Sequence, residues 1–368
     1  MSRRTTGSEQ LMTRSIAILD EDHIVGLLMQ LLSADPSAAD PALKAFFAPE
    51  VCDVQALRAL GAGLTEADGV RLVRCSRPED AVGSQVWLFR RGQVTKAMME
   101  SNPALVLVQR WGERSDMIDR DAARSKGIWV SCLPRPMLHY VAEHVLLLAL
   151  ALVKNLLACD RAVRAPDASA GLAPVGQNRY NWPGIPRTGG LYGKSLGIVG
   201  VGEIGCLVAQ KAGALGMKVL YTNRNRLPVD QERAVGAQFR LLDDLLGESD
   251  IVSLHATFRP GSEVVLTRKR LALMKRGALL INTGRGQLID EDALFDALKS
   301  GALAGAGLDV HGREPRPPGD RICALEQVVL TPHLAGGTRL ATEAELRGVL
   351  ENIRNAFAGR PPEVGRVV

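Results

Sequence analysis

Residues 196–205 read Leu196-Gly-Ile-Val-Gly200-Val-Gly202-Glu-Ile-Gly205, a short apolar run that leads into three glycines spaced as G-x-G-x-x-G. The apolar run predicts a buried strand, and the residues beyond the last glycine predict a helix. In a turn of this kind Gly200 permits the sharp bend and Gly202 permits an anion to approach the backbone closely. Gly205 permits close packing of the helix on the strand.

The start of that helix favours the same kind of ligand. At Glu203 and Ile204 the backbone N–H groups have no partner within the helix, and the helix dipole favours a negative charge there. A dinucleotide pyrophosphate suits both features, so we predict that this turn binds a dinucleotide. The alternative is an ordinary tight turn between a strand and a helix.

The next expected strand, residues 218–222, ends in Asn223-Arg224-Asn225-Arg226. An acidic residue here would bind the ribose 2′-OH of NAD. Because no carboxylate is present to repel a 2′-phosphate and two guanidinium groups are close by, the sequence favours NADP, with NAD as the other candidate. A solvated turn is the alternative interpretation of the two arginines.

Strands and helices alternate along most of the chain, which is typical of an α/β fold with parallel sheets. Helices are expected to end near residue 32 and to cover 95–101, 120–125, 140–157 and 342–357. Strands are expected at 15–19, 86–89, 105–108, 128–130, 196–199, 218–222, 251–255, 279–282, 306–310 and 328–331.

Composition narrows the class of protein. A length of 368 residues suggests two or three domains, and 46% hydrophobic with 23% charged residues is globular and argues against disorder. The net charge of +5 permits anionic small ligands and gives little support to nucleic-acid binding. The longest apolar run, residues 145–153, is far shorter than the ~20 residues of a membrane span. We therefore expect no membrane segment, and no signal peptide is recognisable.

The cysteines indicate neither a metal site nor a disulfide framework. No two stand as C-x-x-C, and none lies at zinc-ligand spacing from a histidine. A chain with this cysteine usage is expected in a reducing, cytoplasmic compartment. The cysteines are Cys52, Cys75, Cys132, Cys159, Cys206 and Cys323.

Polar residues follow three of the later expected strands. Arg285 stands in a turn after 278–282, Glu314 in a loop after 307–310, and His333 directly after 328–331. Because the carboxyl ends of parallel strands share one edge of a sheet, these side chains are expected at one site. Taken singly, each has a plainer interpretation: a surface arginine, a loop charge and a residue near a helix start.

In this order and spacing, the sequence resembles the D-isomer-specific 2-hydroxyacid dehydrogenases, which include glyoxylate/hydroxypyruvate reductases, D-lactate dehydrogenases and D-3-phosphoglycerate dehydrogenases. The resemblance covers roughly residues 86–340. Its stretches are LYGKSLGIVGVGEIG (191–205), DIVSLH (250–255), LLINTGRGQLIDEDAL (279–294), GLDVHGREP (307–315), TPHLAGGT (331–338) and, more weakly, RWGERSDMIDRDAARSKGI (110–128).

This resemblance implies an NAD(P)-dependent oxidoreductase that transfers a hydride between the cofactor and a small 2-keto or D-2-hydroxy acid. It implies that Arg285 binds the substrate carboxylate, that His333 is the acid/base and that Glu314 is its partner. Physical chemistry agrees, since a guanidinium holds a carboxylate in fixed geometry and an imidazolium can donate a proton near neutral pH. Formate dehydrogenases, which resemble this family, have glutamine at the position of Glu314.

The resemblance also implies further cofactor contacts, at Ala256, Thr283, Gly284, Asp309 and Gly336. His255, which stands in His255-Ala256-Thr257 where the family usually has His-x-Pro, and His144 are interpreted as structural residues.

On the substrate side the resemblance implies binding by Arg110 and by a loop at Gly112, Glu113 and Arg114. The family usually has Gly-x-Gly there, so the second glycine is replaced by Arg114, which either adds charge to the pocket or points to solvent. Trp111 either forms a wall of the pocket or packs in the core.

The implied architecture is two doubly wound parallel-sheet domains. A flavodoxin-like substrate domain would comprise residues 1–137 and 338–368, and a Rossmann dinucleotide-binding domain residues 138–337. The family is typically dimeric through the nucleotide domain, so a homodimer is expected. The apolar helix near residue 150 and an arm at 165–192, which contains Trp182, are candidates for its interface. Residues 1–14 are expected to be a disordered polar lead.

Two alternatives to a small 2-keto acid remain. An enzyme like D-3-phosphoglycerate dehydrogenase would need two arginines around the phosphate, where Arg110 matches one and Phe89, beside Arg90, occupies the other. Little chain follows residue 340, so no C-terminal regulatory domain is expected, and glyoxylate or hydroxypyruvate ranks above phosphohydroxypyruvate. The other alternative is a non-catalytic dinucleotide-sensing module like the co-repressors of this fold.

Overall fold

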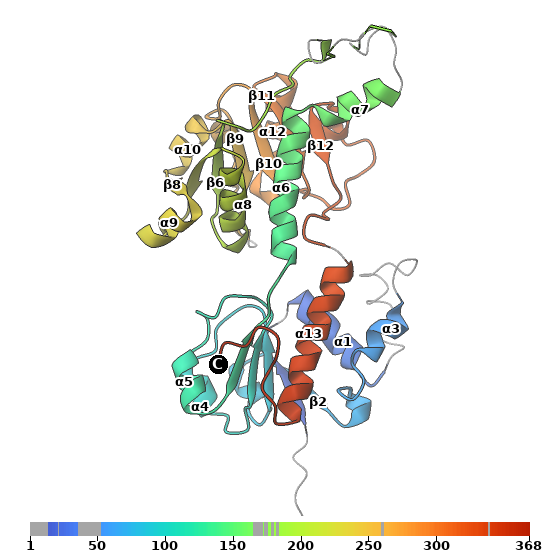
Figure 1. The fold of residues 1–368 in the computed structure, drawn as a ribbon, viewed down its shortest axis with the longest axis vertical. Coiled ribbons are helices and arrows are strands. Elements are labelled where there is room, and N and C mark those ends of the chain that lie inside the picture. Colours follow the sequence, from blue (N-terminus) through green and yellow to red (C-terminus); the bar gives the residue numbers. More distant parts are fainter. Residues whose placement is uncertain are drawn as a thin grey trace, which may run out of the picture. The chain divides into compact units, whose positions relative to one another are not determined.

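The computed structural model describes residues 14–20, 22–35, 53–164, 172, 176–177, 180–181, 184–258, 261–337 and 339–368. The expected lead at 1–13, Cys52, Trp182 and much of the expected arm lie outside the described residues. The chain divides into two compact units (Figure 1). Unit 1 is Met1–Pro136 with Thr338–Val368, and unit 2 is Met137–Gly337. Each is considered by itself.

Unit 1 contains a five-stranded parallel sheet in the order β2-β1-β3-β4-β5. This is the flavodoxin-like order, in which the sheet reverses its direction of growth between β1 and β3. The strands are β1 (Ser15–Ile18), β2 (Arg71–Arg74), β3 (Val86–Phe89), β4 (Leu107–Arg110) and β5 (Trp129–Cys132).

Helices cover both faces of the sheet of unit 1. Leu28, Leu57 and Val349 belong to a core on one face, and Trp87, Met99 and Ala123 to a core on the other. The C-terminal helix therefore packs in unit 1 alongside helices from the N-terminal part of the chain. The first face carries α1 (His23–Leu32), α3 (Val54–Ala59) and α13 (Arg339–Phe357), and the second α4 (Lys96–Glu100) and α5 (Arg120–Ser125); η1 (Glu66–Asp68) and η2 (Pro78–Ala81) are short 3-10 turns.

Unit 2 contains a seven-stranded parallel sheet in the order β12-β11-β10-β9-β6-β7-β8. This is the Rossmann order with one further strand, and the sheet reverses between β6 and β9. The two units confirm the predicted pair of doubly wound parallel sheets. The strands are β6 (Ser195–Val199), β7 (Lys218–Thr222), β8 (Ala237–Phe239), β9 (Ile251–Leu254), β10 (Ala278–Asn282), β11 (Leu303–Leu308) and β12 (Val328–Leu330).

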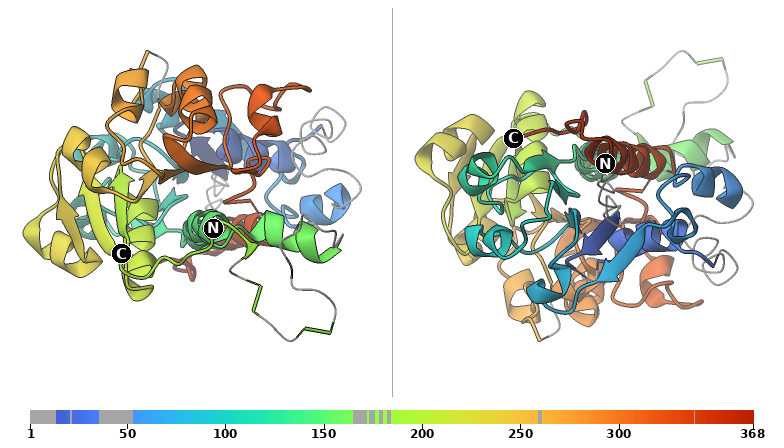
Figure 2. Two further views of the ribbon diagram at one scale, coloured as in Figure 1. Left: turned by 90° about the horizontal axis from the view of Figure 1, so that it is seen from above. Right: turned by 90° about the horizontal axis from the view of Figure 1, so that it is seen from below.

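The sheet of unit 2 is also covered on both faces (Figure 2, left). Residues of α6, α8 and α9 form one core with the strands, and residues of α10, α11 and α12 form another. The helices are α6 (Met137–Val153), α7 (Leu156–Arg164), α8 (Glu203–Ala214), α9 (Val229–Val235), α10 (Leu242–Glu248), α11 (Arg268–Leu271) and α12 (Glu291–Lys299), with 3-10 turns η4 (Gly286–Leu288) and η5 (Arg321–Ala324).

The single helix expected at 140–157 is wrong, because α6 and α7 are separate and meet at an angle of 61°. Asn155 takes the left-handed conformation, with φ of 50°, which asparagine tolerates better than most residues. Gly189 N–H donates to Val153 O at 2.7 Å, and Asn155 Nδ2 donates to Pro186 O at 3.2 Å. The end of α6 is thus held by hydrogen bonds to residues 186–189, which local periodicity does not reveal.

Two short strands, β2 and β8, were not expected, and β4 begins two residues later than the apolar run suggested. β2 reads Arg-Leu-Val-Arg and lies at the edge of its sheet, so its side chains do not carry a continuous apolar pattern. The shift of β4 places Arg110 inside the strand.

Within the described part of the chain, no single helix is long and apolar enough to cross a membrane. Only the bent pair of α6 and α7 reaches that length and composition, and much of α6 is buried inside unit 2.

Candidate active site

The glycine turn after β6 has the geometry of a dinucleotide cradle. Gly200 has φ of 97°, and a Cβ atom there would lie 2.7 Å from Ala256 N, at the end of β9. A Cβ on Gly205 would lie 2.6 Å from Gly200 O, whereas nothing described lies within 4 Å of a Cβ on Gly202. The turn is therefore tightly packed at Gly200 and Gly205 and has open space at Gly202. It lies at the reversal point of the sheet, where ligands of this fold bind.

The N-terminus of α8 completes this cradle. Gly202 is its N-cap and offers no side chain to the N–H groups of the first turn, at Glu203 and Ile204. After β10, which is separated from β6 by β9 in the sheet, Thr283 Oγ1 is buried without a hydrogen-bond partner among the described residues. Unfilled donors and an orphaned hydroxyl at one sheet edge fit a bound dinucleotide.

Of the two arginines after β7, Arg226 forms an ion pair within the described chain and Arg224 does not. Arg226 binds Glu232 through two hydrogen bonds of 2.8 and 2.9 Å, and Tyr221 OH donates to the same carboxylate at 2.5 Å. Together they lower the pKa of Glu232 to about 2. Arg224 is exposed and has no ion pair within the described chain, so it is the guanidinium free to meet a 2′-phosphate.

Glu314 and His333 meet in unit 2 beyond β11 and β12. Glu314 Oε2 lies 2.7 Å from His333 Nδ1, and Glu314 Oε1 accepts from His311 N–H at 2.8 Å. Burial acts to raise the pKa of Glu314, but the hydrogen bonds from His333 and His311 outweigh it and lower the pKa overall. The carboxylate therefore stays ionised and holds the imidazole through Nδ1, which leaves Nε2 for a substrate.

Asp309 builds the turn that carries His333. Its side chain is fully buried and accepts from Thr331 Oγ1 at 2.6 Å and from the N–H groups of Leu334 and Ala335 at 2.9 Å each. His333 N–H donates to Asp309 O at 2.8 Å, and His333 has φ of 53°. Asp309 thus stabilises a left-handed conformation that is uncommon for residues other than glycine.

His144 of α6 joins the same network. Its Nε2 lies 3.0 Å from Thr331 Oγ1 and 3.6 Å from Asp309 Oδ1. Because the Thr331 hydroxyl donates its hydrogen to Asp309, His144 Nε2 donates to Thr331. In the same turn, a Cβ on Gly336 would lie 2.8 Å from the Val141 side chain, so the turn packs closely on α6. Both contacts anchor the histidine-bearing turn to the helix.

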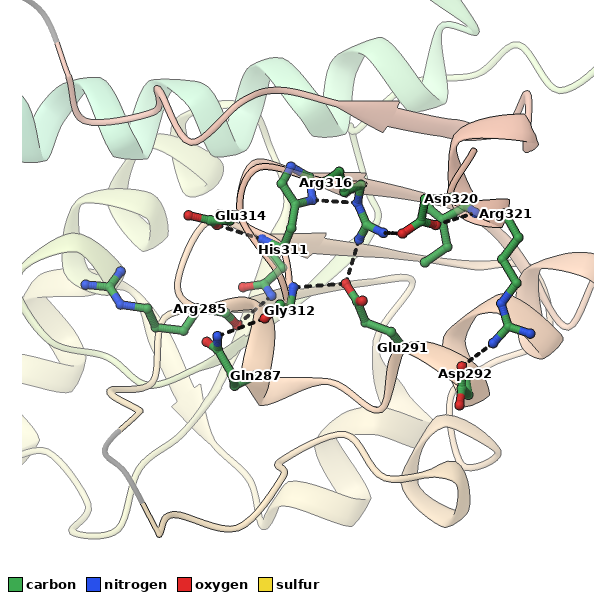
Figure 3. Close-up of polar contacts among 12 residues, drawn as sticks. Arg285, Gln287, Glu291, Asp292, His311, Gly312, Glu314, Arg316, Asp320 and Arg321 are labelled. Carbon is green, nitrogen blue, oxygen red and sulfur yellow. Dashed lines mark hydrogen bonds and ion pairs between the residues drawn. The ribbon is translucent and has the colours of Figure 1, made fainter. Parts of the chain in front are cut away.

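Arg285 lies in the turn after β10. Asn282 fixes that turn, since its Oδ1 accepts from Gly284 N–H at 3.0 Å and its Nδ2 donates to Arg285 O at 2.9 Å. Arg285 Nη1 donates to Gly284 O at 2.6 Å, and no carboxylate pairs with this exposed guanidinium in the described chain. Figure 3 shows the guanidinium of Arg285 and the carboxylate of Glu314 extending to the same side of the loops. The unpaired guanidinium of Arg285 and the carboxylate that holds His333 therefore extend to the same side.

Of the predicted substrate residues of unit 1, Arg110 ends β4 and the others lie in the loop that follows it. Arg110 is only 8% exposed, donates from Nη1 to Arg114 O, and has no partner for Nε among the described atoms. Gly112, with φ of 157°, lies against this guanidinium. Glu113 Oε1 accepts from Arg135 N–H at 3.0 Å.

Two open questions about this loop are answered by the contacts. The Arg114 side chain pairs with Asp116 and is about half exposed, so its charge is already matched. Trp111 is 1% exposed and donates from Nε1 to Glu345 Oε2 at 2.8 Å, within the core of unit 1. Burial raises the pKa of Glu345 in spite of this hydrogen bond. Trp111 therefore packs in the core.

Residues 146–335 match the family model described as "D-isomer specific 2-hydroxyacid dehydrogenase, NAD binding domain". The glyoxylate reductase of Korarchaeum cryptofilum is 36% identical over 256 residues, which are 70% of this chain and 74% of that protein. The chain belongs to this family.

Further comparisons agree with the assignment. D-3-phosphoglycerate dehydrogenase of Mycobacterium tuberculosis is 35% identical over 267 residues, 72% of this chain and 48% of that longer protein. An acyclic imino acid reductase, solved with NADPH and D-arginine, is 28% identical, with a TM-score of 0.55 over 96% of this chain and 100% of that one. The chain is accordingly an NAD(P)-dependent oxidoreductase of 2-hydroxy and 2-keto acids, as the sequence predicted.

Sequence reasoning missed the residues beneath the Glu314–His333 pair. Glu291 and His311 lie inside quoted stretches, 279–294 and 307–315, and Arg316 comes directly after the second, but none of the three was assigned a role. The local sequence offers only the position of Arg316 as a signal, two residues beyond Glu314 and between Pro315 and Pro317. Within the residues described, no group of three or more His, Cys, Asp or Glu side chains is arranged to hold a metal ion.

Proposed function

We propose that this dehydrogenase reduces a small 2-keto acid of the glyoxylate or hydroxypyruvate type to the D-2-hydroxy acid, with NADPH preferred over NADH. The observation that carries the proposal is the 2.7 Å contact between Glu314 Oε2 and His333 Nδ1, on the side to which the unpaired Arg285 also extends. Relatives named glyoxylate reductases, about 36% identical to this chain, support the substrate class.

Unit 2 would hold the cofactor at the carboxyl edge of its sheet. When bound, the dihydronicotinamide supplies the hydride that reduces C2 of the keto acid. Arg224 would pair with the 2′-phosphate, and the N–H groups of α8 would face the pyrophosphate. The proposed cofactor-binding residues are Gly200, Gly202, Glu203, Ile204, Gly205, Asn223, Arg224, Ala256, Thr283, Gly284, Asp309 and Gly336.

Three side chains would serve the substrate. Arg285 would bind its carboxylate through two parallel hydrogen bonds, which fixes the plane of the neighbouring carbonyl group. His333, as imidazolium, would give the Nε2 proton to the carbonyl oxygen, so that the C=O group becomes C–OH. His333 is left neutral, while Glu314 stays a carboxylate throughout. Arg285 and the imidazolium also stabilise the developing alkoxide.

In unit 1, Arg110, Gly112, Glu113 and Arg114 are the proposed substrate-binding loop. The buried, half-satisfied guanidinium of Arg110 favours a second candidate, an enzyme like D-3-phosphoglycerate dehydrogenase, since it could bind a phosphate. Arg90, the other candidate for that phosphate, already pairs with Asp22 at 2.8 Å. The smaller keto acids therefore remain the first proposal. A dinucleotide-sensing module without catalysis is the third.

The proposed assembly is a homodimer in the cytoplasm. Several large apolar side chains of α6 and α7 are exposed, among them Leu147 at 51% and Val163 at 71%, and a second copy would cover them. The five described cysteines are free, which supports a reducing compartment.

Steady-state kinetics with a panel of keto acids tests the proposal. Glyoxylate, hydroxypyruvate and phosphohydroxypyruvate are each assayed with NADPH and NADH, and sedimentation at the same protein concentrations gives the oligomeric state. The proposal requires the best kcat/KM with glyoxylate or hydroxypyruvate. Preference for phosphohydroxypyruvate would favour the second candidate, and cofactor binding without turnover would favour the third.

A further inference from the structure

A buried ionic cluster lies behind Glu314 (Figure 3). Arg316 is at its centre, with a side chain that is only 10% exposed. Its Nη2 pairs with Glu291 at 2.5 Å, its Nη1 pairs with Asp320 at 2.5 Å, and its Nε donates to His311 Nδ1 at 3.0 Å. We call these four residues the Arg316 cluster.

The contact with Arg316 fixes the protonation of His311. Because Nδ1 accepts a hydrogen bond from the guanidinium, it carries no proton, and the proton of the neutral ring is on Nε2. His311 Nε2 then donates to Thr331 O at 3.0 Å. A second proton, on Nδ1, would point directly at the Nε–H group of Arg316. The cluster therefore favours one neutral tautomer and opposes the imidazolium.

His311 is tied to both members of the Glu314–His333 pair. Its backbone N–H donates to Glu314 Oε1 at 2.8 Å, and its ring holds the carbonyl of Thr331, two residues before His333. Glu291 strengthens the same backbone, since its Oε1 also accepts from Gly312 N–H at 3.1 Å.

The charges around His311 come from three elements. Arg316, Asp320, Glu314 and Asp309 belong to its own loop, Glu291 begins α12, and His333 follows β12. The pKa of Asp320 is lowered, because its hydrogen bond from Ile322 N–H and the charge of Arg316 outweigh the opposing effect of burial. Arg316 is thus held on one side by a carboxylate, that of Asp320, whose ionised form is favoured.

We propose that Arg316 is a positioning residue for proton transfer, which keeps His311 neutral with its proton on Nε2 and thereby reserves Glu314 for His333. The proposal rests on the proposed role of that pair. A charged His311 would be a second cation beside Glu314 and would compete with His333 for its carboxylate. A neutral His311 contributes only a fixed backbone N–H.

The tautomer can be measured without any enzymatic assay. In ¹⁵N-histidine-labelled protein, NMR correlations of the imidazole ring identify which nitrogen carries the proton, and the His311→Phe variant assigns the signal. The wild-type protein should show His311 with a bare Nδ1 and its proton on Nε2. In Arg316→Met a form protonated on Nδ1 should become detectable, because the guanidinium no longer donates to that nitrogen.

Kinetics then test the positioning role. Arg316→Met should lower kcat about ten- to a hundredfold, the loss expected when a reacting group is displaced by about an ångström, with the cofactor Kd changed less than twofold. Its rate of keto-acid reduction should fall at lower pH than in the wild type, because His333 loses its carboxylate partner. Arg316→Lys, which retains a charge for Glu291 or Asp320, should recover part of kcat. Arg313→Met removes an exposed arginine from the same loop and should behave like the wild type.

The outcomes separate this inference from the proposed function. A wild-type His311 that carries its proton on Nδ1 overturns it, as does an Arg316→Met enzyme with the wild-type kcat and pH profile. If Arg316→Met does not fold, Glu291→Gln makes the same test, because it weakens the hold on Arg316 while it keeps a hydrogen-bonding side chain. A wild-type protein that reduces no keto acid contradicts the proposed function, whereas the NMR experiment still decides the state of His311.

Discussion

The side-chain amide of Asn223 is hydrogen-bonded on both sides to the backbone of Val201. Its Oδ1 accepts from Val201 N–H at 2.6 Å, and its Nδ2 donates to Val201 O at 3.1 Å. The end of β7 is thereby fastened to the glycine turn after β6. Asn223 acts on the shape of the turn, which leaves Arg224 as the residue proposed to contact a 2′-phosphate.

The separate roles of Asn223 and Arg224 predict how a substitution of Arg224 changes the cofactor preference. Arg224→Ala should lower kcat/KM for NADPH about ten- to a hundredfold and leave that for NADH nearly unchanged, since a charge-assisted hydrogen bond contributes about 1.5–3 kcal/mol. Arg226→Ala is the matched control, because Arg226 already pairs with Glu232 and should not alter the ratio. The measurement is the ratio of the two efficiencies. NADH preferred by the wild type, or an unchanged ratio in Arg224→Ala, would contradict the role of Arg224.

Asn223→Ala should affect both cofactors alike. Without the two hydrogen bonds to Val201, the glycine turn loses a constraint that any dinucleotide needs, so the dissociation constants of NADPH and NADH should rise together. Fluorescence titration of each cofactor checks this. A rise in the dissociation constant of NADPH alone would show that Asn223 itself contacts the 2′-phosphate.

Arg285→Lys should raise the KM for the keto acid strongly and leave the cofactor Kd unchanged. Lysine keeps the charge but cannot form the two parallel hydrogen bonds of a guanidinium with a carboxylate. Arg276→Lys is a suitable control, since Arg276 is exposed at the opposite end of the same strand, β10. Kinetics of Arg285→Lys that match the control would remove Arg285 from the substrate site.

The Glu314–His333 pair predicts a pH dependence of known sign. His333→Ala should slow reduction and oxidation by roughly 10²–10⁴. Reduction needs the protonated imidazole, so it should slow as pH rises, whereas oxidation should slow as pH falls. The lowered pKa of Glu314 keeps its carboxylate ionised on the acid side. In Glu314→Gln the imidazolium loses this carboxylate, so the limb should move to lower pH, and a limb that does not move would show that Glu314 is not the partner of His333.

Much of this site could be predicted because the sheet topology determines where the strand ends lie. In a parallel sheet the carboxyl ends of all strands share one edge, so Arg285, Glu314 and His333 could be assigned to one region of unit 2 from the strand ends alone. The glycine turn is only partly local, since Gly205 packs on Gly200 O within the turn, whereas Gly200 packs against Ala256 at the end of β9.

What could not be predicted depends on the paths of loops. The contact between Arg316 and His311 requires the 311–320 loop to fold back on itself, and no periodicity encodes that. The separation of α6 from α7 similarly depends on Gly189, far along the chain from Val153. The two hydrogen bonds of Asn223 occupy a side chain that the sequence pattern assigned to the ribose.

His255 supplies a test of stability rather than catalysis. Burial lowers its pKa to about 4 from an ordinary 6.5, and its Nε2 lies 2.8 Å from Ser253 Oγ. The folded protein therefore favours the neutral ring. As pH falls below 6.5 the unfolded chain takes up a proton that the folded chain refuses, so stability present at neutral pH is lost toward pH 4. The loss in the free energy of unfolding by pH ~4.5 is up to about 2.5 kcal/mol.

Denaturant unfolding at pH ~8 and ~4.5 checks this. The free energy of unfolding should decrease less in His255→Gln than in the wild type, whereas His139→Gln, at an exposed position of α6, should match the wild type. Equal decreases in all three proteins would mean that the folded state protonates His255 freely.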